Sequence, residues 1–199
     1  NFPTINEDTP GNGSTVDSFL NEDSASDLEN FLDGGVRGVA ITFTDNTNGN
    51  WQFSVNGGSD WTNFAATASA SLLLDGSISG HRVRFNPAQD FFGTAAIKYR
   101  AWDKTSGSVA GTANTTSNGG ITPFSAGEVT KSITVRSVND APIATFASNP
   151  PAVNEDTGAQ TINSYVSSVN GATAGEGEQT TFTYTVARAS GTTGLFSTA

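Results

Sequence analysis

Residues 38–56 read GVAITFTDNTNGNWQFSVN, and they give the first indication of the fold. Two segments of this stretch, residues 38–44 and 51–56, are rich in the β-branched and aromatic side chains that favour strands. Between them, residues 46–49 read NTNG, and an Asn-Gly pair is typical of a tight turn between antiparallel strands. The stretch therefore predicts a β-hairpin in which residues 42–45 pair with residues 50–54.

Four segments further along the chain have the same strand-forming composition, at residues 71–75, 82–86, 95–102 and 128–136. Turn-forming pairs such as Asp75-Gly76 and Asn86-Pro87 stand between them. Short strands that alternate with turns are typical of an all-β, antiparallel Greek-key β-sandwich. The sequence also predicts one short helical turn, at residues 26–31, and a long surface loop at residues 106–120.

A repeated motif indicates two modules in tandem. Residues 3–9 read PTINEDT and residues 151–157 read PAVNEDT, so the motif returns after 148 positions. We therefore expect one β-sandwich module at residues 1–142 and the start of a second module at residues 143–199. The second segment is too short to form a sandwich alone, because two or three strands cannot bury two sheet faces. Either further sequence or a strand from another chain is expected to complete it.

The chain of 199 residues is acidic, with a formal net charge of -10. Eight acidic residues precede Arg37, the first basic residue, so most of the imbalance lies near the N-terminus. Nucleic-acid binding depends on Lys and Arg and is not expected, whereas carboxylates are ligands that Ca²⁺ prefers. The chain has no Cys, which excludes disulfides, zinc-thiolate sites and thiol nucleophiles. No apolar stretch reaches the roughly 18 residues of a membrane span, so membrane insertion is not expected.

Several motifs resemble those of one family. Residues 131–142 read KSITVRSVNDAP and residues 99–107 read YRAWDKTSG, and both are similar to the last strands and linker of cadherin and bacterial cadherin-like repeats. Residues 38–61 and 82–94 resemble the same tandem modules of large bacterial surface proteins and adhesins. The second segment resembles an Ig-like module of such proteins. The resemblance implies cadherin-like and Ig-like β-sandwiches in tandem, in an extracellular or cell-surface protein.

The same resemblance implies calcium sites at the ends of the modules. In cadherin-type arrays the ligands come from the first strand, the A-x-D motif and the Asn-Asp of the linker. The linker here departs from the family pattern at Ser137, where an Asp is usual. The implied ligands, including the loosely spaced acids that stand in for the family's D-x-D motif, are Glu7, Asp8, Asp27, Asp33, Asp103, Asn139, Asp140, Glu155 and Asp156.

Catalytic motifs are absent from the sequence. His81 is the single histidine, and no Ser lies in a G-x-S-x-G motif. We therefore expect a non-enzymatic, calcium-stabilised structural or adhesive repeat segment of a large extracellular bacterial protein. Its expected partners are neighbouring repeats of the same protein and further copies of it.

Two alternatives remain open from the sequence. Trp51, Trp61 and Trp102 could form an aromatic platform, which would make the chain a carbohydrate- or matrix-binding adhesin domain with a glycan or cell-surface partner. The incomplete second module could instead indicate a subunit of a self-assembling sheath, surface layer or filament, completed by a neighbour's strand.

Overall fold

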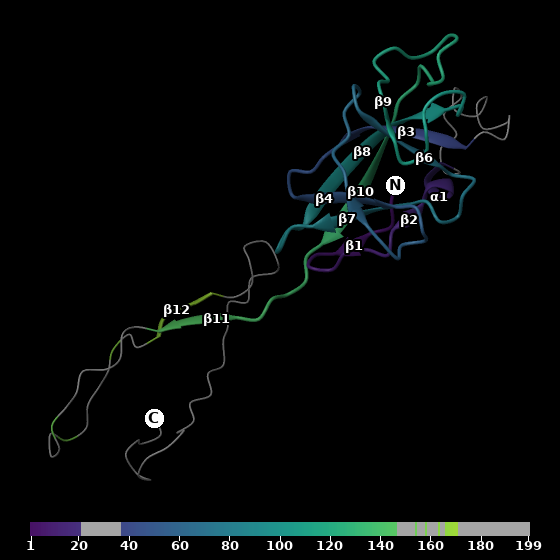
Figure 1. Ribbon diagram of the computed structural model, residues 1–199. Coiled ribbons are helices and arrows are strands. Elements are labelled where there is room, and N and C mark those ends of the chain that lie inside the picture. The colour runs from purple at the N-terminus through teal and green to yellow at the C-terminus, as the bar shows by residue number, and fades with distance from the viewer. Residues whose placement is uncertain (21–36, 147–153, 155–157, 159–162, 164–165, 171–199) are drawn as a thin grey trace. The chain divides into compact units, whose positions relative to one another are not determined.

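The computed structural model describes residues 1–20, 37–146, 154, 158, 163 and 166–170 (Figure 1). The chain divides into two compact units, Asn1–Val138 and Asn139–Ala199, whereas the sequence placed the boundary after Pro142. The predicted helical turn at residues 26–31 lies outside the described residues. Among the described residues, no helix has the length and hydropathy needed to cross a membrane.

The described residues of the first unit form two β-sheets and one short helix, α1 (Val16–Leu20). The six-stranded sheet has the order β1 (Ile5–Asn6), β10 (Val129–Arg136), β8 (Gly93–Trp102), β3 (Gly38–Thr44), β6 (Ser71–Asp75) and β9 (Thr112–Ala113). The four-stranded sheet has the order β2 (Ser14–Thr15), β7 (Arg82–Pro87), β4 (Gly49–Ser54) and β5 (Thr62–Asn63). The all-β class is therefore confirmed, and each of the six predicted strands forms within two residues of its expected bounds.

Most strand pairs are antiparallel. Among the described strands the exception is β1, which pairs in parallel with the end of β10 through Ile5 and Val135. The second unit contributes β11 (Ile143–Phe146) and β12 (Val166–Asn170), which form an antiparallel pair of their own.

Alternation of side chains explains why these segments form strands. In β7 the buried Val83 and Phe85 alternate with the half-buried Arg82 and Arg84. Successive side chains of a strand point to opposite faces, so this pattern buries one face and leaves the other partly exposed. The buried faces of the two sheets contribute to one hydrophobic core. That core includes Val39, Ile41, Ile97, Tyr99, Ile133 and Val135 from the six-stranded sheet and Trp51, Val83 and Phe85 from the four-stranded sheet.

Strand β6 is buried on both faces. Every residue of β6 is buried, and the opposite face of the six-stranded sheet carries a smaller cluster formed by Ala40, Leu73, Trp102 and Phe124. Phe124 belongs to the segment between β8 and β10, and the indole Nε1 of Trp102 donates to the Ser106 carbonyl of that segment at 2.7 Å. The predicted surface loop at residues 106–120 is therefore not only a loop, because it contains β9, which pairs with β6 at the edge of the sheet.

The predicted hairpin between β3 and β4 is wrong. Thr44 of β3 pairs with Ile97 of β8, whereas Gly49 of β4 pairs with Pro87 of β7, so the two strands lie in different sheets. The Asn46 side chain holds the connection, because its Oδ1 accepts from the Trp51 N–H at 3.2 Å and its Nδ2 donates to a carbonyl near β5 at 2.9 Å. The turn-forming residues are used here to cross from one sheet to the other.

Candidate metal centre

Glu7 and Asp8 directly follow β1, at the edge of the six-stranded sheet. The Glu7 N–H donates to the Arg136 carbonyl at 3.0 Å, which places Glu7 beside the last residue of β10. Asp8 has a positive φ of 58°, a left-handed conformation that short polar side chains tolerate better than most residues. The parallel pairing of β1 with β10 thus brings the N-E-D motif to the C-terminal end of the first unit.

The Glu7 carboxylate is buried and only half satisfied. Glu7 is 1% exposed, and its Oε1 accepts a hydrogen bond from the Val138 N–H. Its Oε2 is also buried and has no hydrogen-bond partner in the described part of the chain. A buried charge without a counter-charge or hydrogen bonds is costly, so a carboxylate in this state fits a cation ligand.

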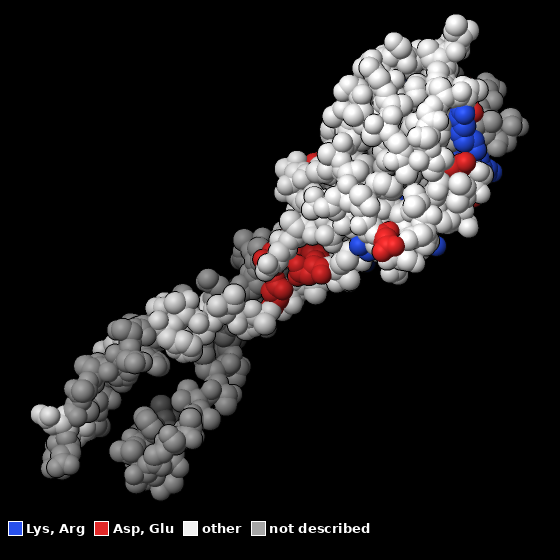
Figure 2. Space-filling model, in the orientation of Figure 1, with Lys and Arg blue, Asp and Glu red and all other residues white. Residues whose placement is uncertain are grey.

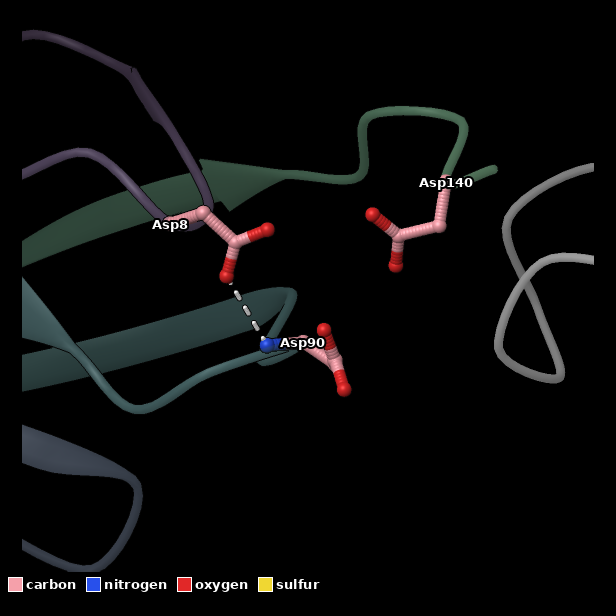
Figure 3. A group of neighbouring side chains, drawn as sticks. All are labelled: Asp8, Asp90 and Asp140. Carbon is pink, nitrogen blue, oxygen red and sulfur yellow. Dashed lines mark hydrogen bonds between the residues drawn. The ribbon is translucent and has the colours of Figure 1, made fainter. Parts of the chain in front are cut away.

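Asp90 approaches Asp8 from the loop between β7 and β8. The Asp90 N–H donates to Asp8 Oδ1 at 3.1 Å, across 82 positions of sequence (Figure 3). Within the first unit, Asp8 and Asp90 each offer a carboxylate oxygen, and these two atoms lie within 4.8 Å of one another. Asp140 follows Val138 by two positions, so the covalent chain keeps it within about 8 Å of that residue. Carboxylates at such a separation repel one another unless a cation or protons neutralise them.

Asp103 is not brought to this end of the first unit. Gly93 at the start of β8 pairs with Val135, and Tyr99 near its end pairs with Val129. Asp103 follows the last residue of β8, a strand of 10 residues, so it lies at the end remote from Asp90. Its Oδ1 accepts from the Thr105 N–H at 2.8 Å and from the Thr105 hydroxyl at 2.7 Å, the contacts of a local turn.

The other predicted ligands are not placed in the carboxylate group. Asn139 is exposed, and its Nδ2 donates to the Asp140 carbonyl at 3.0 Å. Four of the predicted ligands lie outside the described residues, namely Asp27, Asp33, Glu155 and Asp156.

Sequence reasoning missed Asp90. The residue lies in residues 82–94, which read RVRFNPAQDFFGT, but nothing in that stretch indicates that residue 90 meets residue 8. A metal site assembled from separate segments has no short motif of its own, unlike an EF-hand loop. The available signal was an Asp in a loop at the same end of the sheet as the N-E-D motif. This signal could be recognised only with knowledge of which strands pair, because the pairing decides which loops lie at that end.

A second polar cluster joins the end of β6 to the turn after β8. Asp75 Oδ2 accepts from Lys104 Nζ at 2.9 Å, and Asp75 Oδ1 accepts from the Ser77 hydroxyl at 2.6 Å. Burial by itself raises the pKa of Asp75, but the hydrogen bonds from Ser77 and Lys104 and the charge of Lys104 outweigh it and lower the pKa. The Asp75 N–H donates to His81 Nδ1 at 3.0 Å, which requires the neutral imidazole with its proton on Nε2. The bonds of this cluster fix a turn.

The tryptophans do not form a shared exposed face. Trp51 is 0% exposed and packs between Phe2 and Phe85, with both ring centroids at 5.2 Å, and Trp102 is 2% exposed. Trp61 is half-buried, with the Arg84 guanidinium 4.1 Å from its ring centroid. Two of the three rings are therefore inaccessible to a sugar in this conformation.

Charged side chains are sparse on the face of the molecule that Figure 2 shows. Most of the described surface seen in Figure 2 carries neither acidic nor basic residues.

Comparison of the chain with protein-family models, curated proteins and solved structures finds no match. Its functional interpretation therefore depends on the carboxylates at the end of β10 and on the sequence motifs.

Proposed function

We propose that this chain is a calcium-stabilised structural or adhesive segment of a large extracellular surface protein. The observation that carries the proposal is the buried Glu7 carboxylate, with one oxygen hydrogen-bonded to Val138 and the other without a hydrogen-bond partner among the residues that the structure describes. A divalent cation bound there provides the missing counter-charge. The linker begins at this point, so the cation acts where the first unit ends.

The proposal includes a cadherin-like Greek-key β-sandwich as the fold of the first unit. Support comes from one core that receives side chains from both sheets, including Trp51 and Ile97. The crossing of the chain between sheets after β3 also supports it, because sandwiches use such connections. The family resemblance of the linker and of the strand motifs points the same way.

Calcium fits the available ligands better than other metals. The candidate ligands in the first unit are all oxygens: Asp8 and Asp90 supply neighbouring carboxylates, and Glu7 adjoins Asp8 in the chain, with carbonyls and water to complete six to eight positions. Zinc and copper favour Cys or His, and the chain has no Cys and a single His, which lies in the Asp75 cluster. Magnesium demands a compact octahedral site, which separate segments are less suited to supply.

The expected effect of the cation is mechanical. Without it, the carboxylates repel one another and oppose the approach of the N-E-D segment and the β7–β8 loop. With it, these two segments are held together, and the first unit resists heat, force and proteolysis at this point. Neighbouring repeats of the same protein are the proposed partners, and the cell surface is the proposed location.

Calorimetric titration tests the proposal on the full chain. We expect Ca²⁺ to bind, and the Glu7→Gln and Asp90→Asn variants to bind at least about tenfold more weakly, a loss of about 1.4 kcal/mol each. Asp45→Asn is the matched control, because the Asp45 carboxylate accepts a hydrogen bond from the Thr47 N–H in a turn, at 3.1 Å, away from the Glu7 and Asp8 segment in sequence. Absence of calcium binding by the unmodified chain, or equal weakening in all three variants, would contradict the proposal.

A further inference from the structure

The described turns contain four Asn-Gly pairs that the calcium proposal does not use. Asn-Gly is the dipeptide most open to attack by a backbone nitrogen on the preceding side-chain amide, because glycine has no side chain in the way. The reaction needs a free glycine N–H and a mobile peptide plane between the two residues. The four pairs are Asn12-Gly13, Asn48-Gly49, Asn56-Gly57 and Asn118-Gly119.

Two of these pairs have an occupied glycine N–H. The Gly57 N–H donates to the Gly80 carbonyl at 2.9 Å, and the Gly119 N–H donates to the Phe124 carbonyl at 2.7 Å. The Asn56 side chain is held as well, because its Oδ1 accepts from the Asp60 N–H at 3.0 Å. Both pairs must break these bonds before the nitrogen can attack.

A third pair is held by the strand ladder. The Asn48 carbonyl accepts from the Ala88 N–H at 2.9 Å, and Gly49 begins β4 opposite Pro87. The peptide plane between Asn48 and Gly49 is therefore fixed against β7. Rotation into a reactive geometry requires local opening of the sheet.

Asn12-Gly13 has none of these restraints. Asn12 is exposed, and neither its side chain nor the Gly13 N–H makes a hydrogen bond within the described part of the chain. The contact found here is a long one, from Arg82 Nη1 to the Gly13 carbonyl at 3.3 Å, and it leaves the reacting nitrogen free.

We propose that Asn12 is the site of spontaneous deamidation in the first unit. The Gly13 nitrogen attacks Cγ of Asn12, the N–Cγ bond forms, and ammonia leaves with the proton from Gly13. Water then hydrolyses one of the two carbonyls of the resulting succinimide, which gives Asp or isoaspartate at position 12. No reactant other than water is needed, and the exchange adds one negative charge.

The modification alters a defined place in the fold. Asn12 and Gly13 line a cavity of about 420 Å³ together with Phe2, Val83 and Arg84. Isoaspartate also adds a carbon to the backbone immediately before β2, which pairs Ser14 with Val83. The aged protein therefore carries a new carboxylate on this cavity and a longer connection into the four-stranded sheet.

Timed incubation followed by peptide mass spectrometry tests the inference. The native full chain is held in mildly alkaline buffer and digested with trypsin, which separates the Asn12 peptide (residues 1–37) from residues 38–82 and 105–131. We expect the mass increase of amide-to-acid exchange at Asn12 about tenfold or more faster than at Asn48, Asn56 or Asn118, because the held pairs must first open. Fragmentation assigns the position within each peptide.

The chain unfolded in urea is the control. There the four rates are expected to converge, since every pair has the same glycine neighbour and no fold to restrain it. The Asn12→Gln variant keeps the amide but lengthens the side chain, and it should lose the fast reaction at this position. Faster reaction at any other of the three pairs in the native chain would overturn the inference, as would an unchanged order of rates in urea.

Discussion

Glu7 is the residue that most directly links the fold to a cation. Its carboxylate is buried beside β10, yet one of its two oxygens has no partner among the described residues. Proteins rarely leave a buried charge in this condition, because its desolvation costs several kcal/mol. The arrangement is explained if the residue is a ligand.

Replacing Glu7 by Gln removes the charge and keeps nearly the same shape. In EGTA we expect the variant to melt at the same temperature as the unmodified chain or higher, since the unpaired charge is gone. In calcium we expect it to lose about 1 to 3 kcal/mol relative to the unmodified chain. Thermal unfolding under both conditions measures this, and a variant that is less stable only in EGTA would contradict the role of Glu7.

The lowered pKa of Asp75 predicts a pH dependence of stability that does not involve calcium. The folded pKa of Asp75 is lowered, so its contribution to stability is present above its unfolded pKa of about 3.8 and is lost as the pH falls through the folded pKa. At neutral pH, Asp75→Asn should lower the free energy of unfolding by about 1.5 to 3 kcal/mol, through the weakened Lys104 and Ser77 bonds. Urea unfolding at neutral pH and near pH 3 checks the sign, because the difference between the two proteins must shrink in acid. An equal difference at both pH values would contradict this assignment.

At the scale of elements, β6 depends on burial on both faces. Leu73 is 0% exposed and packs with Ala40, Trp102 and Phe124, under the segment that joins β8 to β10. Leu73→Ala should therefore lower the free energy of unfolding by about 2 to 5 kcal/mol, as is usual when a large side chain in a closed core is replaced by a small one. Ile121→Ala is the matched control, because Ile121 is fully exposed. The free energy of unfolding of this variant should stay within about 0.5 kcal/mol of that of the unmodified chain.

Urea unfolding of both variants decides the point. Similar losses of unfolding free energy in the two variants would mean that the segment between β8 and β10 does not cover the cluster of Ala40, Leu73, Trp102 and Phe124.

The strands could be predicted from the sequence, but their partners could not. Period-two burial in β7 and β8 is a local property, and it appears directly in the side-chain alternation. Pairing is not local, because an Asn-Gly turn suits a hairpin and also suits the crossing between sheets that Asn46 holds. The hairpin prediction failed at this point.

The outermost strands of both sheets are short. β1 and β9 border the six-stranded sheet, β2 and β5 border the four-stranded sheet, and each has 2 residues. Short edge strands discourage pairing with other chains. The described edges of the first unit are therefore poorly suited to pairing with strands of another chain.

At the scale of the whole molecule, the sequence located acidic residues but could not assemble them. Glu7, Asp8 and Asp140 were implied by the family resemblance, whereas Asp90 emerged only from the strand pairing. Asp103 was implied too, yet the direction of β8 places it at the remote end of the unit. Each difference arises because a metal site depends on which strand ends lie together.

Thermal unfolding of the full chain in calcium and in EGTA tests the central claim most directly. A cation bound at one hundred times its Kd adds about 2.7 kcal/mol to stability, which corresponds to a rise of about 8 to 11 °C in Tm for a unit of this size. We predict such a rise with calcium, growing with its concentration, and a smaller one with equal magnesium. An unchanged Tm across millimolar calcium, together with unchanged protease sensitivity, would contradict the account.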